Sequence, residues 1–123
     1  TYYKGLRSNT LVPGVMSPRL GAYHIDDVEI SSAFDVTADK VGRDVADAIW
    51  ATPNNTFRFA DVAATGTLVR RGPTLDGLGR YVRSEVRESD LPDVNVQEIL
   101  RESRTEVVVS YLPVGSARAT EYY

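Results

Sequence analysis

The sequence contains no cysteine and only one histidine, one tryptophan and one methionine among its 123 residues. The lack of cysteine excludes disulfides, thiolate metal sites and a cysteine nucleophile, and it fits a reducing cytoplasm, where we expect the protein to work. His24 alone cannot build a metal cluster, so we interpret it as a packing or surface residue beside Tyr23 and expect no metal site. No apolar run approaches the roughly 20 residues that cross a membrane, and no signal-peptide pattern opens the chain.

An excess of positive charge is also missing, since 14 Lys and Arg face 17 Asp and Glu for a net charge of −3. The arginines at 70, 71, 80, 83 and 87 are scattered, which predicts solvated ends of helices and strands rather than a stripe that follows nucleic-acid phosphates. We therefore expect no nucleic-acid partner and no membrane partner. The length suggests one domain, and the first residue is Thr1 rather than Met, so we expect a piece of a longer protein.

The pattern of apolar residues predicts strands that alternate with helices. A mostly apolar run at 28–35 predicts a strand covered on both faces, and a helical pattern at 38–50 follows it, capped by Thr37 or Asp39. The three valines of 106–111 predict a central strand that is also covered on both faces. The other predicted elements are the tail of a helix at 1–7, a loop at 8–23, strands at 57–60 and 67–70, helices at 75–86 and 93–103, and a last helix from Ala117. This order predicts an α/β fold, Rossmann-like, with a mostly parallel sheet and flanking helices.

Asp35 is the first candidate functional residue because it ends the predicted strand 28–35. An acid at the carboxyl end of such a strand holds the adenine ribose in dinucleotide-binding domains, where it accepts hydrogen bonds from the ribose hydroxyls. Asp is also a favourable N-cap, and the pattern alone weighs the two interpretations equally. No Gly-x-Gly-x-x-Gly turn precedes this strand.

Two loops are further candidates for the lining of a site. In the segment 110–116 a predicted strand enters a bend rich in Pro and Gly, and Ser110, Tyr111 and Ser116 supply polar groups there. Taken alone, this segment favours a plain strand-to-helix turn capped by Ser116. The loop 71–79 is rich in glycine but lacks the Gly-Lys-Ser/Thr ending of a phosphate-binding loop, so we interpret it as a loop that could line the site.

Several stretches of the chain together resemble the actinobacterial branch of the myo-inositol-phosphate synthase (inositol-3-phosphate synthase) family. They follow the family's order with nearly its spacing, and they cover essentially the whole chain. The stretches are Val12-Pro13-Gly14-Val15-Met16, Tyr23-His24, Ala33-Phe34-Asp35-Val36, Lys40-Val41-Gly42, Asn54-Asn55-Thr56, Arg71-Gly72-Pro73-Thr74-Leu75-Asp76-Gly77 and Ser110-Tyr111-Leu112-Pro113-Val114-Gly115-Ser116.

The resemblance implies an NAD-dependent enzyme, usually tetrameric, that converts D-glucose 6-phosphate to 1L-myo-inositol 1-phosphate. Oxidation at C5, aldol closure and reduction follow one another, so the reaction has no net redox change. Residues 1–123 would be part of a Rossmann-like NAD-binding domain. The family's first strand and its Gly-rich loop would lie upstream. The part that holds the chemistry and the tetramer contacts would lie downstream. The resemblance therefore assigns no catalytic residue to this chain, which we expect to be inactive alone.

The resemblance also implies cofactor-binding positions. Asp35 matches the acid at the adenine ribose, and Asp44 and Tyr123 match positions that the family associates with NAD. Ser103 falls where the family tends to have Ala, so any role of Ser103 in cofactor binding would come from its backbone. The loop beside the dinucleotide is matched by Ser110, Tyr111, Leu112 and Pro113.

Departures from the family's pattern leave more than one interpretation open. The segment 16–20 and the pair Val36-Thr37 differ from the family, which allows a divergent paralogue that cyclises another sugar phosphate. A second hypothesis is a truncated, non-catalytic module that pairs with a full-length subunit. A third is an unrelated nucleotide-sugar or redox Rossmann protein.

Overall fold

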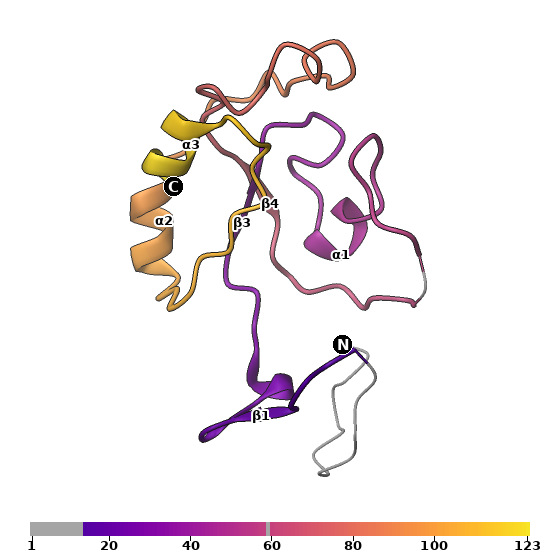
Figure 1. Ribbon diagram of the computed structural model, residues 1–123, viewed down its shortest axis with the longest axis vertical. Helices are drawn as coiled ribbons and strands as arrows, with labels where there is room; N and C mark the ends of the chain where they lie inside the picture. The colour runs from indigo at the N-terminus through magenta and orange to yellow at the C-terminus, as the bar shows by residue number, and fades with distance from the viewer. Residues whose placement is uncertain (1–13, 59) are drawn as a thin grey trace.

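The chain folds into short helices and strands joined by long connections (Figure 1). The computed structural model describes residues 14–58 and 60–123, so the predicted helix tail at 1–7, the first part of the loop 8–23 and Phe59 of the predicted strand 57–60 lie outside the described residues. The elements are β1 (Arg19–Leu20), β2 (Tyr23–His24), the 3₁₀ helix η1 (Ile25–Asp27), β3 (Ala33–Asp35), α1 (Val45–Ala48), β4 (Val69–Arg71), α2 (Val96–Glu102) and α3 (Ala117–Tyr122).

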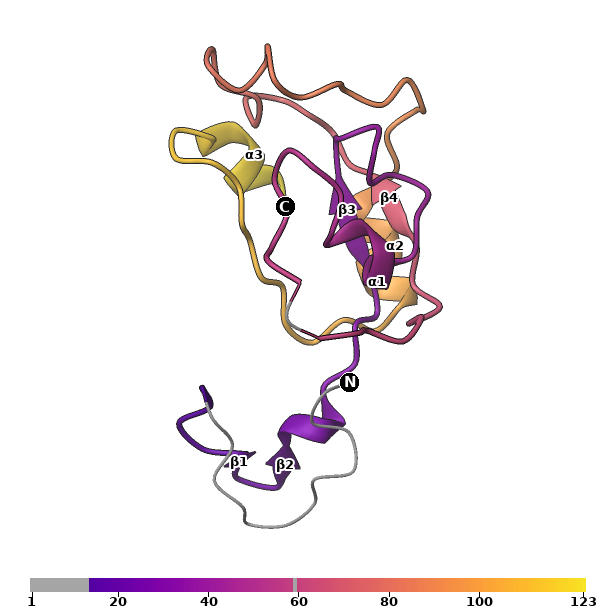
Figure 2. The same ribbon diagram turned by 90° about the vertical axis from the view of Figure 1, so that its right-hand side faces the viewer.

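A parallel pair of strands, β3 and β4, lies at the centre of the main body. Ala33 pairs with Val69, and the register continues to Asp35 and Arg71 at the carboxyl ends. Helices α1 and α2 lie on opposite sides of this pair, as the two views show (Figures 1 and 2). The predicted α/β class is therefore confirmed. The described residues form two sheets of two strands each, one parallel and one antiparallel, so the larger and mostly parallel sheet is not found among them.

The second sheet is a hairpin that projects from the main body, to which residues 28–32 connect it (Figure 2). In this hairpin Arg19 pairs with His24 and Leu20 with Tyr23, so the described end of the predicted loop 8–23 is a hairpin instead. His24 is buried, and its Nδ1 accepts a hydrogen bond of 3.1 Å from the amide of Asp26 at the start of η1. The interpretation of His24 as a packing residue is confirmed, and a capping role is added.

The two strands predicted to be covered on both faces are corrected by the structure. Only the last three residues of 28–35 form a strand, and Val28 and Ile30 are exposed. The segment 106–111 forms no strand, and its valines at 107, 108 and 109 are 76%, 54% and 66% exposed. A strand needs hydrogen-bond partners from elsewhere in the chain. None of the amides of 107–111 donates a backbone hydrogen bond to another described residue.

The helix predicted at 38–50 is shorter in the structure and begins later. Residues 38–43 form turns, and Gly42 adopts a φ of +84°, a left-handed conformation that interrupts a helix. The helix α1 starts at Val45, and its N-cap is Asp44, whose carboxylate accepts from the amide of Ala46 at 2.8 Å. The caps predicted at Thr37 and Asp39 are therefore wrong.

Of the remaining predicted elements, two helices and one strand are present among the described residues, and one helix and one strand are not. Residues 75–86 form turns instead of a helix, with Leu75 at a φ of +45°. The helix predicted at 93–103 is present as α2, which begins three residues later because Asn95 caps it through the amide of Glu98. The strand predicted at 67–70 is present as β4, shifted toward Arg71, and no strand forms at 57, 58 or 60. The last helix starts at Ala117, as predicted.

The core of the described residues is thin, since Val96 of α2 is their one large side chain that is fully buried. Small residues from α1 and α3, one residue of β4 and one of the loop 71–79 complete the buried apolar set of the described residues, which is Ala46, Ala48, Val69, Leu78, Val96 and Ala119. Among the described residues, no helix has the length and apolar character needed to cross a bilayer.

Candidate functional site

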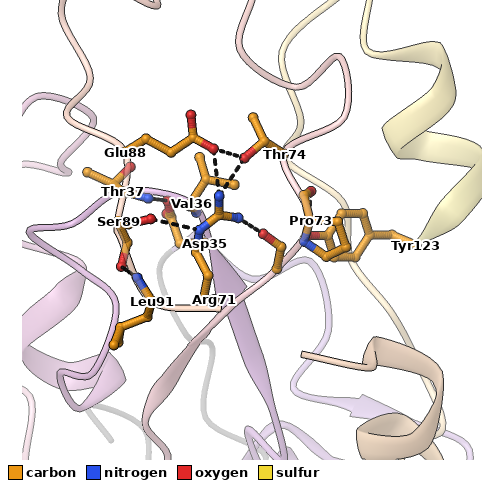
Figure 3. Close-up of polar contacts among 11 residues, drawn as sticks. Asp35, Val36, Thr37, Arg71, Pro73, Thr74, Glu88, Ser89, Leu91 and Tyr123 are labelled. Carbon is orange, nitrogen blue, oxygen red and sulfur yellow. Dashed lines mark hydrogen bonds and ion pairs between the residues drawn. The ribbon is translucent and has the colours of Figure 1, made fainter. Parts of the chain in front are cut away.

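The carboxyl ends of β3 and β4 form one edge, and this edge is the candidate site. Asp35 and Arg71 are paired in register at the ends of the two strands, and the amide of Gly72 donates to the Asp35 carbonyl at 3.1 Å. Residues in register on parallel strands project from the same face, so the two side chains lie next to each other (Figure 3). Ligands of open α/β sheets bind beyond the carboxyl ends of the strands.

The Asp35 carboxylate accepts hydrogen bonds within the chain at one oxygen, and the other oxygen faces the Lys40 ammonium. Its Oδ1 accepts from the amides of Val36 at 2.7 Å and Thr37 at 2.8 Å. Its Oδ2 lies 3.8 Å from the Lys40 ammonium, the side chain is 29% exposed, and within 14–58 and 60–123 nothing donates a hydrogen bond to Oδ2. Asp35 therefore caps a turn and not α1, which starts at Val45. The acceptor capacity of Oδ2 remains for a ligand.

Arg71, which the sequence placed at the start of the loop 71–79 that could line the site, lies at this edge. Its side chain is 11% exposed, which corrects its interpretation as a solvated strand end. The guanidinium donates to the Ser89 carbonyl at 3.3 Å, to the Thr74 hydroxyl at 2.8 Å, to the Glu88 carboxylate at 2.6 Å and to the Gly72 carbonyl (Figure 3). The Thr74 hydroxyl also donates to Glu88. We call Arg71, Thr74, Glu88 and Ser89 the Arg71 cluster.

Glu88 reaches this edge because its segment runs alongside the residues that follow β3. The amide of Ala38 donates to the Arg87 carbonyl and the amide of Ser89 donates to the Val36 carbonyl, both at 2.8 Å, and Thr37 forms an antiparallel bridge with Glu88. Glu88 lies 17 residues beyond Arg71 in the sequence. No local pattern in the sequence could therefore have joined them.

Tyr123 lies at the same edge as Asp35. Its hydroxyl donates to the Pro73 carbonyl at 3.2 Å (Figure 3), and its ring lies 6.1 Å from the ring of Phe34 in β3. Burial raises the pKa of Tyr123 to about 12, so it stays a neutral donor at ordinary pH. A ligand role for Tyr123 stays a prediction.

The loop 71–79 connects the edge to α3 through Asp76. The Asp76 carboxylate accepts from the amides of Arg118 at 2.9 Å and Ala119 at 2.8 Å. The amide of Arg118 is the largest cause of the lowering of the Asp76 pKa. Ser116 occupies the N-cap position, but its side chain makes no capping hydrogen bond. The cap predicted at Ser116 is therefore supplied by Asp76, a residue 42 positions away from Arg118.

Asp44 does not join Asp35, because its carboxylate holds another loop. Besides capping α1, it accepts from the amide and hydroxyl of Thr65 at 3.1 and 3.0 Å and from the amide of Gly66 at 2.7 Å. These donors, with the amide of Ala46 first, lower the pKa of Asp44 to about 2. The structure gives Asp44 a role in positioning the approach to β4, and its assignment to a cofactor stays a prediction.

Ser103 lies near the amino end of β3, away from the carboxyl edge. Its hydroxyl donates to the Ile99 carbonyl at 2.7 Å and lies 2.9 Å from the Thr105 hydroxyl. Thr105 in turn lies 2.8 Å from the hydroxyl of Ser31, which precedes β3. The side chain of Ser103 therefore closes α2 and joins it to the start of β3.

The segment 110–113 is not joined to Asp35 by any hydrogen bond or ion pair among the described residues. Ser110, Tyr111 and Pro113 are exposed, and Tyr111 is 90% exposed. Leu112 is partly buried, and its Cδ2 would lie 3.8 Å from a Cβ placed on Gly77. Leu112 thus lies beside Gly77 of the loop 71–79, and the other three side chains of the segment are open to solvent.

An open groove of about 570 Å³ runs along β4, and its lining includes Thr67, Val69, Arg71 and Leu91 but not Asp35. It adjoins the candidate edge only through Arg71, so we place the site at the edge and not in the groove. No three acidic or histidine side chains of 14–58 and 60–123 come together as a metal site.

Comparisons with known proteins agree with the sequence motifs. No model of a known protein family matches the chain. The chain is 48% identical over 122 residues to the inositol-3-phosphate synthase of Mycolicibacterium smegmatis, a match that covers 99% of this chain and 34% of that protein. Proteins of the same name from Mycobacterium tuberculosis and Corynebacterium glutamicum are 49% and 48% identical over 122 residues, with 33% and 34% of their lengths covered. The predicted resemblance is confirmed.

Proposed function

We propose that this chain, which spans about a third of the length of the inositol-3-phosphate synthases that it resembles, forms part of the NAD-binding domain of such an enzyme. The whole protein would convert D-glucose 6-phosphate to 1L-myo-inositol 1-phosphate as a homotetramer. The domain would be Rossmann-like. The parallel order of β3 and β4 supports this proposal, as does the acid at the end of β3.

One observation carries the cofactor assignment, namely the Asp35 carboxylate at the carboxyl edge, whose Oδ2 accepts no hydrogen bond from the described residues. Its neighbour Lys40 places an ammonium 3.8 Å from Oδ2, and the two amides on Oδ1 fix the direction of the carboxylate. A carboxylate held in this way is oriented to accept from the hydroxyls of the adenine ribose. The bound NAD would supply a hydride acceptor and donor. The contribution of this chain is to bind and orient it.

The experiment that tests the assignment compares two substitutions of Asp35 by calorimetric titration of the full-length protein with NAD. Asp35→Asn keeps an oxygen that can accept from Val36 and Thr37 but removes the charge, whereas Asp35→Ala removes both. We expect both variants to weaken NAD binding by about 10- to 100-fold, since hydrogen bonds to charged groups contribute about 1.5–3 kcal/mol.

The matched control is Asp90→Asn. Asp90 is an exposed acid that makes no hydrogen bond or ion pair with the described residues of the edge, so this variant should bind NAD as the wild type does. If Asp35→Asn binds NAD as tightly as the wild type while Asp35→Ala is less stable, the role of Asp35 is to cap a turn and not to bind NAD. That result would remove the physical support for the cofactor assignment.

A further inference from the structure

The Arg71 cluster places a cation directly beside the acid of the proposed ribose site. In dinucleotide-binding domains an acid at this position accepts from the ribose 2′-hydroxyl of NAD, whereas a nearby Arg accommodates the 2′-phosphate of NADP. Here both residue types are present and paired in register, Asp35 on β3 and Arg71 on β4. The choice between the two dinucleotides therefore depends on where the guanidinium is held.

The guanidinium is engaged by partners within the chain. Its four hydrogen bonds use nearly all of its N–H donors. Two of the acceptors are backbone carbonyls and one is the Thr74 hydroxyl, so Glu88 is its one charged partner among the described residues. Because hydrogen bonds between ionised groups are the strongest of this kind, Glu88 contributes most to holding Arg71.

A second cation near Asp35, Lys40, is occupied too. The Lys40 ammonium donates to the Asn54 carbonyl at 2.6 Å and faces Asp35 at 3.8 Å. The four charged groups, Asp35, Glu88, Lys40 and Arg71, balance to zero. A 2′-phosphate, which brings additional negative charge, would find no uncommitted cation among them.

We propose that Glu88 acts as a positioning residue for cofactor selectivity. It holds the Arg71 guanidinium in the Arg71 cluster, so that the edge accepts NAD and rejects NADP. This inference rests on the proposed NAD site. It assigns to Glu88 a role that acts through Arg71 and not through contact with the cofactor. When the carboxylate is replaced by a neutral amide, Arg71 gains the freedom to pair with a phosphate.

The test measures the dissociation constants of NAD and NADP by calorimetry on the full-length wild type and on Glu88→Gln. We expect the ratio of the NADP constant to the NAD constant to fall by about tenfold or more in Glu88→Gln, as one charge-assisted hydrogen bond to the phosphate becomes possible. The fall should be larger in the double variant Asp35→Ser/Glu88→Gln than in Asp35→Ser. The control Glu85→Gln, an exposed acid three residues away, should leave the ratio unchanged.

A purely structural role for Glu88 would weaken the binding of both dinucleotides equally, and that result would overturn the inference, as would an unchanged ratio. If Glu88→Gln does not fold, Thr74→Val removes the hydroxyl that contacts both Arg71 and Glu88, and we expect a smaller shift in the same direction. A wild type that binds neither dinucleotide would overturn the proposed function and this inference together. A wild type that binds NAD with no change of ratio in either variant would overturn the inference alone.

Discussion

Replacement of Gly72 by Ala tests directly whether Tyr123 packs on the edge of the parallel pair. Gly72 is buried and its φ lies outside the left-handed region, so Ala can adopt its backbone conformation. An added Cβ would overlap the Tyr123 hydroxyl oxygen and lie 2.9 Å from ring carbon Cζ. The cost of the substitution therefore comes from this contact and not from the backbone.

The size of the destabilisation follows from the contacts that the Tyr123 ring must lose. To make room, Tyr123 must leave its hydrogen bond to the Pro73 carbonyl and part of its packing against Phe34. A lost hydrogen bond costs about 0.5–1.5 kcal/mol, and insertion of a methyl group into a packed site costs about 1–3 kcal/mol. Because the ring is at the end of a side chain and can move, we expect the free energy of unfolding to fall by about 1–2 kcal/mol.

The assay is a double-mutant cycle followed by urea unfolding of the full-length protein. Gly72→Ala is measured in the wild type and in a Tyr123→Ala background, where the added methyl group meets no ring and should be nearly neutral. The difference between the two effects gives the coupling energy of the pair. The control is Gly79→Ala, because a Cβ at Gly79 meets nothing within 4 Å. This exposed site should be unaffected or slightly stabilised.

The reasoning would be refuted if Gly72→Ala cost the same in both backgrounds. That result would show that Tyr123 does not lie against Gly72 in solution. Equal effects at Gly72 and Gly79 would have the same meaning, since a general preference for alanine would then account for both.

Two further predictions concern the carboxylates that hold loops. Asp44 has a folded pKa of about 2, below its ordinary value of 3.8, so its contribution to stability is present above pH 3.8 and is lost as pH falls toward 2. Asp44→Asn should therefore flatten the dependence of stability on pH between about 4 and 2 in urea titrations, and an unchanged slope would contradict this. Asp76→Ala leaves two amides of α3 without their acceptor. The amides of α3 should therefore exchange hydrogen faster in this variant than in the wild type. Equal protection of α3 in both proteins would count against this role for Asp76.

The helices that the sequence placed best are those whose signals are local. The start of α3 at Ala117 follows the bend Pro113-Val114-Gly115-Ser116, and α2 lies within its predicted range because its apolar spacing and a nearby cap specify it. The helix at 38–50 was predicted too long, because Gly42 turns left-handed and Asp44 is held by Thr65 and Gly66. Those two partners lie 21 and 22 residues away from Asp44 and have no local signal.

The residues of the candidate site also differ in whether a local signal in the sequence identifies them. Asp35 was identified from its place at the end of an apolar run, a local feature that the structure confirms as the end of β3. Arg71 was placed in a loop that could line the site, but its pairing with Glu88 was not identified, because that pairing requires the segment 87–89 to lie beside 36–38. Ser103 and Asp44 lie apart from Asp35, and only the fold could show this.

By itself, the sequence determined the α/β class, the approximate places of α2 and α3, the acid at the end of β3 and the resemblance to a family. Only the tertiary structure decided which residues share the edge with Asp35, where Arg71 is held, and that Val107, Val108 and Val109 form no strand among the described residues. The physical reason is the range of the interactions. A helix closes its hydrogen bonds within a few residues, whereas a strand and a cluster of charges depend on partners that the fold brings from far along the chain.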